Sequence, residues 1–305
     1  MKIQEKLKFI LKISDFTQDR LAKELGVSFP TLNSWINGKS EPRKKAEEKI
    51  NNLYKELTGE KIIPTDILLA KGQIIEKKRK QYKNVLEAII KKQDVYDELV
   101  LSLTYNTNSI EGSTLTKHDT ADILFHNVAL PDKSLTEQLE AKNHQTALKY
   151  LFEHTKKEDK IDEKLILKLH SILMSGVRDD AGFYRRHGVR IVGANISTAN
   201  YMKVPELMTD LVKDINKSYE NTLFHISKIH SVFEKIHPFS DGNGRIGRLL
   251  INAMLLKKNL PPAVIKQEKK KFYYSYLNKA QNTEDYSLLQ DFISDAVIEG
   301  FKIIE

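Results

Sequence analysis

The chain has 305 residues, with 40% apolar and 30% charged side chains, which is enough for one large domain or roughly two to three small ones. It contains no cysteine, which excludes disulfide frameworks and thiolate chemistry, and its formal net charge of +8 is compatible with nucleic acid or nucleotide phosphates as partners. The lysine-interrupted N-terminus lacks the apolar stretch of a signal peptide, and no run of about 18 apolar residues occurs, so we expect a cytoplasmic protein without a membrane span.

The N-terminal residues show the pattern of two short helices joined by a tight turn. Leu21, Ala22 and Leu25 form one apolar helical stripe, and Ala22 is small where a second helix must approach closely. Gly26 can adopt the left-handed conformation that ends the first helix, and Ser28 is a suitable N-cap for the second. The pattern therefore predicts a helix-turn-helix.

This segment resembles the Cro/repressor family of helix-turn-helix domains over roughly residues 1–55, through its Leu-Gly-Val-Ser turn and through Trp35 followed by Asn-Gly-Lys. The resemblance implies that the second helix enters the major groove of double-stranded DNA. The side chains that it places against DNA are Gln18, Ser28, Phe29, Thr31, Asn33, Ser34 and Lys39. Phe29 and Pro30 depart from the usual polar helix start and reduce the groups available for base edges. A helical bundle used for protein contacts or dimerisation is the alternative.

Glycine and proline are scarce elsewhere, and their positions divide the rest of the chain. They cluster in ranges that we interpret as loops between helices: 26–42, 58–64, 182–205, 238–247 and 260–262. We predict a helix-turn-helix unit at 1–58, a connecting helical segment at 59–95 and one helical domain at 96–305. Only 188–204 has the β-branched, glycine, asparagine and serine residues of a β-hairpin. The expected fold is mainly α with this one hairpin.

Residues 237–248, HPFSDGNGRIGR, combine residue types that neither a core helix nor an ordinary turn requires. Gly242 and Gly244 lead into an apolar helical run, so the loop presents the unpaired N–H groups and positive end of a helix N-terminus. An anion can approach the glycine backbone closely because no Cβ intervenes. Arg245 and Arg248 lie three residues apart on the helix, and guanidinium groups match phosphate oxygens. The segment therefore predicts an anion site for more than one phosphate.

His237 and Asp241 lie on the N-terminal side of this anion site. A carboxylate repels phosphates unless a hard cation such as Mg²⁺ lies between them. A histidine beside a bound polyphosphate can accept a proton from an attacking hydroxyl. Together these residues predict the transfer of a phosphorus group from a nucleotide to a hydroxyl.

The same twelve residues match every fixed position of the Fic-domain signature, and the chain is identified as resembling that family. Its members transfer AMP from ATP to serine, threonine or tyrosine hydroxyls of proteins, and a few remove it. The resemblance implies that His237 is the general base, that Asp241 binds Mg²⁺ and that Phe239 seats the loop in the core. It implies phosphate binding by Gly242, Asn243, Gly244, Arg245 and Arg248. Phosphate-transferring relatives carry lysine in place of Gly244, which favours AMP transfer here.

A second motif, TNSIEG at 107–112, resembles the family's inhibitory pattern of serine or threonine, three residues and Glu-Gly. The preceding residues predict a helix, and a glutamate near its end could reach the anion site. The resemblance implies that Glu111 pairs with Arg248, blocks the γ-phosphate and holds ATP in an unproductive pose. In some relatives the equivalent glutamate positions a water that removes AMP, and the sequence does not separate the two roles.

The predicted hairpin corresponds to the family's flap, which holds the target segment by main-chain pairing. Met202 and Lys203 are candidates for target contact, whereas Gly182, Tyr184 and Arg185 are expected to be structural. Three tyrosines near the C-terminus are candidates for packing, adenine contact or self-modification: Tyr273, Tyr274 and Tyr276.

The sequence therefore predicts an auto-inhibited protein adenylyltransferase that uses ATP and Mg²⁺, modifies a protein hydroxyl and is coupled to binding of double-stranded DNA. The alternative is a transcription regulator whose Fic domain senses nucleotide with little turnover. The intact His237, Asp241, Arg245 and Arg248 speak against an inactive domain. An antitoxin-like interaction protein is disfavoured, because Glu111 and the active-site motif share one chain. A homodimer is compatible with these hypotheses.

Overall fold

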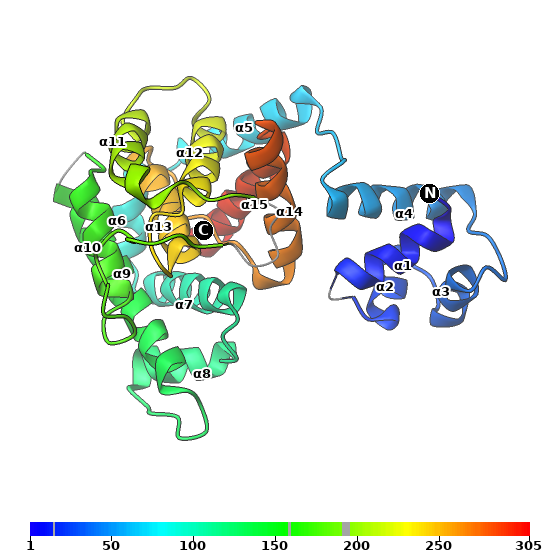
Figure 1. The fold of residues 1–305 in the computed structure, drawn as a ribbon, viewed down its shortest axis with the longest axis horizontal. Helices are drawn as coiled ribbons and strands as arrows, with labels where there is room; N and C mark the ends of the chain where they lie inside the picture. The colour runs from blue at the N-terminus through cyan, green and yellow to red at the C-terminus, as the bar shows by residue number, and fades with distance from the viewer. Residues whose placement is uncertain (15, 158–159, 191–195) are drawn as a thin grey trace.

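The N-terminal unit is a bundle of short helices. The computed structural model describes residues 1–14, 16–157, 160–190 and 196–305. The unit contains α1 (Ile3–Ile13), α2 (Gln18–Leu25), α3 (Phe29–Ile36) and α4 (Lys44–Thr58) (Figure 1). Its largest fully buried side chains are Leu7, Ile10, Leu21, Leu32 and Ile50.

The turn between α2 and α3 has the predicted caps. The side chain of Thr17 accepts a hydrogen bond from the backbone N–H of Arg20 at 3.2 Å and begins α2. Gly26 ends that helix in the left-handed conformation, with φ of 72°. The Ser28 hydroxyl then accepts from the Thr31 N–H at 3.4 Å and begins α3. The predicted helix-turn-helix geometry is confirmed.

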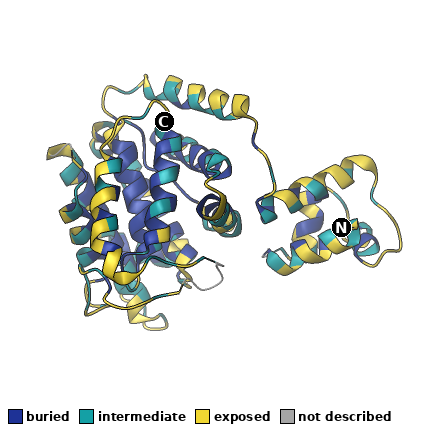
Figure 2. Ribbon diagram, turned by 45° about the horizontal axis from the view of Figure 1, so that its top comes forward, coloured by how far each residue is buried: buried dark blue, intermediate teal, exposed yellow. Residues whose placement is uncertain are grey.

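The larger unit is a helical bundle built around α12 and α13. Its elements are α5 (Thr65–Arg79), α6 (Val85–Lys91), α7 (Gln93–Glu111), α8 (Lys117–Ala121), the π-helix η1 (Asp122–His126), α9 (Leu135–Lys157), α10 (Glu163–Leu173), the 3-10 helix η2 (Tyr201–Lys203), α11 (Val204–Ile215), α12 (Thr222–Ile236), α13 (Asn243–Lys257), the 3-10 helix η3 (Gln267–Lys269), α14 (Lys270–Thr283) and α15 (Ser287–Ile304). Helix α13 packs against α7, α9, α10 and α12, and the buried residues concentrate in these central helices (Figure 2). The loop between α12 and α13 is therefore held on several sides.

The predicted β-hairpin at 188–204 is not found in the part of the chain that the structure describes. Residues 191–195, which include its centre, lie outside the described residues. At its C-terminal end the prediction is wrong, because Tyr201–Lys203 form η2 and Val204 begins α11. The Asn200 side chain accepts from the Met202 N–H at 3.0 Å, and this local bond favours the tight helical turn over a strand.

The two units pack together through α4 and α14. The Ser275 hydroxyl of α14 donates to the Leu57 carbonyl at 2.9 Å, and Phe272 packs against the hydrophobic cores of both units. Helix α5 packs on α15, where Lys71 lies 2.6 Å from the carboxylate of Asp291. The limits that we place between domains stay a prediction. No helix among the described residues is long and apolar enough to cross a membrane.

Candidate active site

His237 follows the last residue of α12 and takes the left-handed conformation, with φ of 52°. Its Nδ1 lies 3.2 Å from the Glu234 carbonyl oxygen, which can only accept, so Nδ1 carries the proton and Nε2 keeps a free lone pair. The side chain is 18% exposed, and burial lowers its pKa below the ordinary histidine value. His237 is therefore a neutral imidazole at pH 7 that can accept a proton at Nε2.

The loop after His237 is seated by Phe239 and Asn243. The Phe239 ring is fully buried and stacks on the His170 ring with centroids 3.7 Å apart. The Asn243 side chain accepts from the Phe239 N–H and donates to its carbonyl, each at 2.9 Å. These contacts agree with a structural role for Phe239. The two hydrogen bonds also occupy the Asn243 side chain, so the phosphate contact that the resemblance implies for Asn243 would come from its backbone N–H.

Two glycines shape the start of α13. Gly242 has φ of 76°, and a Cβ there would lie 2.9 Å from the Met174 sulfur. A Cβ on Gly244 would overlap the Glu111 carboxylate. Neither position therefore has room for a Cβ, and the first N–H groups of α13 have no partner within the helix.

Arg248 is held by the C-terminal end of α7. Its Nε donates to the Thr107 hydroxyl at 2.6 Å and its Nη2 to the Glu111 carboxylate at 2.5 Å. Its guanidinium carbon lies 5.9 Å from the centre of the Tyr273 ring. Burial raises the pKa of Glu111, but the attraction and hydrogen bond of Arg248, together with the charges of Arg245 and Lys270, lower it overall. The contact between Glu111 and Arg248 that the sequence predicts is present as a charged pair.

Arg245 points to a different helix. Its side chain is 3% exposed, and its Nη1 lies 2.7 Å from the carboxylate of Glu140 on α9. The Asp241 carboxylate is farther away, with 3.8 Å between its Oδ1 and Nη2 of Arg245. The structure thus brings the two motif arginines to separate carboxylates, Glu111 for Arg248 and Glu140 for Arg245.

Asp241 is the candidate ligand for a cation. Its side chain is 51% exposed, and its Oδ1 accepts the Gly242 N–H at 2.6 Å. No group of three or more potential metal-ligating side chains occurs among the described residues. Mg²⁺ commonly binds one or two carboxylates and completes its shell with phosphate oxygens and water. A single exposed carboxylate beside a helix N-terminus therefore fits Mg²⁺ that arrives with a nucleotide.

Two acidic residues near the site, Glu234 and Glu140, were not predicted from the sequence. Glu234 is buried one helical turn before His237, with 4.0 Å between its Oε2 and the histidine Nδ1. Burial raises the pKa of Glu234 to about 8, so this neighbour of His237 is mostly uncharged at pH 7. The spacing of three residues is a sequence signal for Glu234. Glu140 carries no such signal, since it lies on a long polar helix far from the motif.

Arg185 and the three tyrosines have distinct environments. Arg185 is buried and donates to the carbonyls of His237 at 2.7 Å and Ala199 at 2.5 Å, which agrees with a structural role. Tyr273 and Tyr276 are buried in the core, whereas Tyr274 is 39% exposed. Two of the three tyrosines therefore pack.

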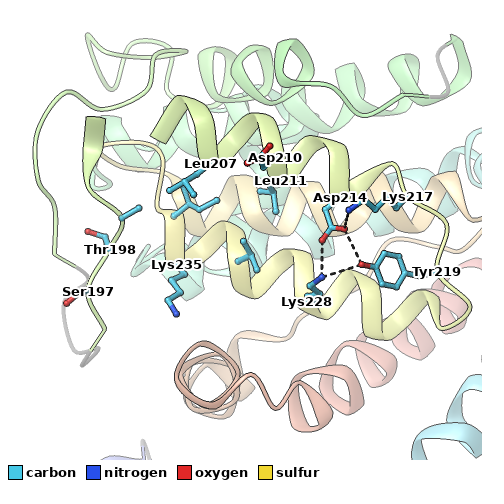
Figure 3. Close-up of a pocket in the computed structure, with 13 residues that line it drawn as sticks. Ser197, Thr198, Leu207, Asp210, Leu211, Asp214, Lys217, Tyr219, Lys228 and Lys235 are labelled. Atoms are coloured by element: carbon cyan, nitrogen blue, oxygen red, sulfur yellow. Dashed lines mark hydrogen bonds and ion pairs between the residues drawn. The ribbon is translucent and has the colours of Figure 1, made fainter. Parts of the chain in front are cut away.

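A groove of about 560 Å³ lies between α11 and α12 beside the 197–199 segment (Figure 3). Its apolar wall includes Leu211 and Ile236, and Ile236 directly precedes His237. At the other end Asp214 pairs with Lys228 at 3.1 Å. His237 itself is not among the residues that line the groove.

The candidate DNA-facing residues are all at least partly exposed; Gln18 begins α2, and the others lie on α3 or next to its ends. Two of them bond to each other, with 2.8 Å between the Ser28 and Thr31 hydroxyls. Ser34 bonds to Ser40 at 2.8 Å, and Asn33 accepts from Asn37. The structure brings these side chains onto one small unit, and their role toward DNA stays a prediction.

Comparison with known proteins matches residues 160–255 to the Fic/DOC family and residues 7–55 to the helix-turn-helix family. The chain is 30% identical over 220 residues to the protein adenylyltransferase Fic of Nematostella vectensis, covering 68% of this chain and 49% of that protein. It therefore spans about half the length of this curated relative.

Two solved structures share the fold. A Fic-domain-containing signaling protein from Bacteroides thetaiotaomicron has a TM-score of 0.67 and 25% identity, over 77% of this chain and 96% of that one. Fic-1 from C. elegans has a TM-score of 0.68 over 98% of this chain and 90% of that one, and at 19% identity it shows the fold alone. The chain therefore carries a Fic/DOC-family domain that follows an N-terminal helix-turn-helix domain of the Cro/repressor type.

Proposed function

We propose that this chain is an auto-inhibited protein adenylyltransferase that transfers AMP from ATP to a serine, threonine or tyrosine hydroxyl of a protein. One observation carries the proposal: His237, with Nε2 free to accept a proton, ends α12, and only the short loop 238–242 separates it from the glycine-containing start of α13. The adenylyltransferase names of its relatives support AMP as the transferred group.

In the proposed reaction the target hydroxyl oxygen attacks the α-phosphorus of ATP. The new oxygen–phosphorus bond forms as the bond to the bridging oxygen breaks, and pyrophosphate leaves. The hydroxyl proton passes to Nε2 of His237. The N–H groups of Asn243 and Gly244 would stabilise the charge on the phosphate oxygens. Asp241 would hold Mg²⁺, which when bound would supply further positive charge to those oxygens.

Auto-inhibition is proposed to act through Glu111. Its carboxylate lies on Arg248 and against Gly244, where an outer phosphate of ATP would need to bind. An anion that occupies the guanidinium removes its charge from the nucleotide and repels the phosphate. The family resemblance gives the same carboxylate a second role, the orientation of a water, so removal of AMP from a modified protein belongs to the proposal as a second activity.

Labelled ATP tests the transferred group and the base together. Glu111→Gly, supplied with Mg²⁺ and a lysate of the source cell, is expected to label protein from ATP carrying ³²P at the α-phosphate but not at the γ-phosphate. Glu111→Gly/His237→Ala should lose that label, because no group accepts the hydroxyl proton. Label from the γ-phosphate would contradict AMP transfer. No label despite intact ATP binding would favour a nucleotide-sensing regulator.

We also propose that α3 binds double-stranded DNA. Asn33→Ala with Lys39→Ala is expected to abolish retention of the protein on duplex DNA at ordinary salt, because it removes a base-facing amide and a phosphate-facing cation. Asn52→Ala with Lys55→Ala is the matched control, since both residues lie exposed on α4 of the same unit. Equal retention of the two double variants would contradict this surface.

Helix α14 supports a coupling between the proposed activities. Phe272 and Ser275 on this helix contact the N-terminal unit. Tyr273 on the same helix lies under Arg248, and its hydroxyl is 2.7 Å from Nε2 of His230. A shift of the N-terminal unit on DNA would therefore act on a helix that also supports the nucleotide site.

A further inference from the structure

Glu140 is a carboxylate beside the anion site to which neither motif assigns a role. Its side chain is 17% exposed, and its Oε1 lies 2.7 Å from Nη1 of Arg245. Of the described residues, only Glu140 and Asp241 bring a carboxylate within 4 Å of this guanidinium. Two carboxylates therefore compete for one buried cation, and one of them is the candidate ligand for Mg²⁺.

The two ion pairs differ in length. Nη2 of Arg245 is 3.8 Å from the Asp241 carboxylate, whereas Nη1 is 2.7 Å from the Glu140 carboxylate, so the attraction to Glu140 is the stronger of the two. Asp241 instead accepts the Gly242 N–H at 2.6 Å and remains half exposed. A buried guanidinium without a counter-charge is strongly unfavourable. If Glu140 lost its charge, Arg245 would therefore turn to Asp241, its other carboxylate neighbour.

We propose that Glu140 is a positioning residue that holds Arg245 away from Asp241 and so leaves the Asp241 carboxylate free for the cation that accompanies the nucleotide. This inference rests on the proposed function for the identity of the ligand. An Asp241 paired with Arg245 would offer less negative charge to Mg²⁺. Loss of a partner outside the metal's own ligands commonly changes metal affinity about 10- to 100-fold.

Calorimetric titration of the full chain with ADP, in Mg²⁺ and in EDTA, tests the proposal without any turnover. ADP lacks the γ-phosphate that we propose Glu111 to block. In the wild-type protein Mg²⁺ is expected to tighten ADP binding. We define the Mg²⁺ ratio as the dissociation constant of ADP in EDTA divided by that in Mg²⁺. In Glu140→Gln this ratio should fall about tenfold, with the constant in EDTA unchanged. Gln keeps almost the same size and shape as Glu but removes the charge.

A double variant separates positioning from folding. Glu140→Gln/Arg245→Gln removes both charges, leaves no buried unpaired cation and frees Asp241. Its Mg²⁺ ratio should return toward that of the wild type, although ADP should bind more weakly in Mg²⁺ and in EDTA alike, because Arg245 is an expected phosphate contact. Glu153→Gln, exposed on the same helix, is the control and should keep the wild-type ratio. A wild-type Mg²⁺ ratio in Glu140→Gln would overturn the positioning role of Glu140 but leave the proposed function standing. Absence of ADP binding by the wild-type protein would overturn both.

Discussion

Replacing Glu111 by glycine is expected to raise the initial rate of AMP transfer by at least about tenfold. The carboxylate donates no group to the reaction and accepts a charge-assisted hydrogen bond from Arg248 at 2.5 Å. Such bonds contribute about 1.5–3 kcal/mol, and each 1.4 kcal/mol is a tenfold change. Freeing Arg248 should therefore shift ATP into the productive pose. The rate is measured as α-³²P label incorporated into protein at saturating ATP and Mg²⁺.

Two further variants distinguish release of Arg248 from a general loosening of α7. Glu111→Gln keeps the size of the side chain without its charge and should give a rate between the wild type and Glu111→Gly. Glu98 lies on the same helix and forms only an exposed ion pair with Lys117. Glu98→Gln should therefore leave the rate of AMP transfer unchanged. A Glu111→Gly rate equal to that of the wild type would refute inhibition by this residue.

Replacing Phe239 by alanine is expected to lower the free energy of unfolding by about 3–5 kcal/mol. The Phe239 ring is 0% exposed, stacks on His170 and lies 5.6 Å from the Tyr184 ring. Its removal leaves a cavity beneath the loop that carries His237, where the packed helices cannot collapse to fill it. Urea unfolding followed by circular dichroism measures the change.

Phe183→Ala is the matched control for this prediction. Phe183 is 63% exposed near the same loop, so its loss should change the free energy of unfolding by less than about 0.5 kcal/mol. Similar losses in the free energy of unfolding for Phe239→Ala and Phe183→Ala would show that Phe239 does not seat the loop in the core. A Phe239→Ala variant that stays folded is also expected to bind ADP more weakly, because the hydrogen bonds between the Phe239 backbone and the Asn243 side chain would lose the support of the packed ring.

Some features followed from the sequence because they depend on residues close together in the chain. The caps at Thr17 and Ser28 and the left-handed Gly26 each involve contacts within a few residues. The same holds for the glycine-lined start of α13. Local hydrogen bonds and the absence of a Cβ act wherever these residues occur, so their outcome can be predicted without the fold.

The hairpin prediction shows the limit of this local argument. β-Branched residues and turn residues favour a strand pair, yet Tyr201–Lys203 form a 3-10 helix and Val204 begins α11. The Asn200 side chain satisfies the Met202 N–H locally, and Pro205 suits the first turn of a helix. Side-chain capping by one asparagine therefore outweighed strand propensity at this end of the segment.

The sequence by itself determined which chemical groups this protein has and where its helices turn, because both depend on residue type and short-range contacts. It could place Glu111 near Arg248 only through the family pattern, since 137 positions separate them and α7 must first pack on α13. The pairing of Arg245 with Glu140 was decided by tertiary structure alone, because only the packing of α9 on α13 brings a carboxylate of no recognisable motif to a buried guanidinium.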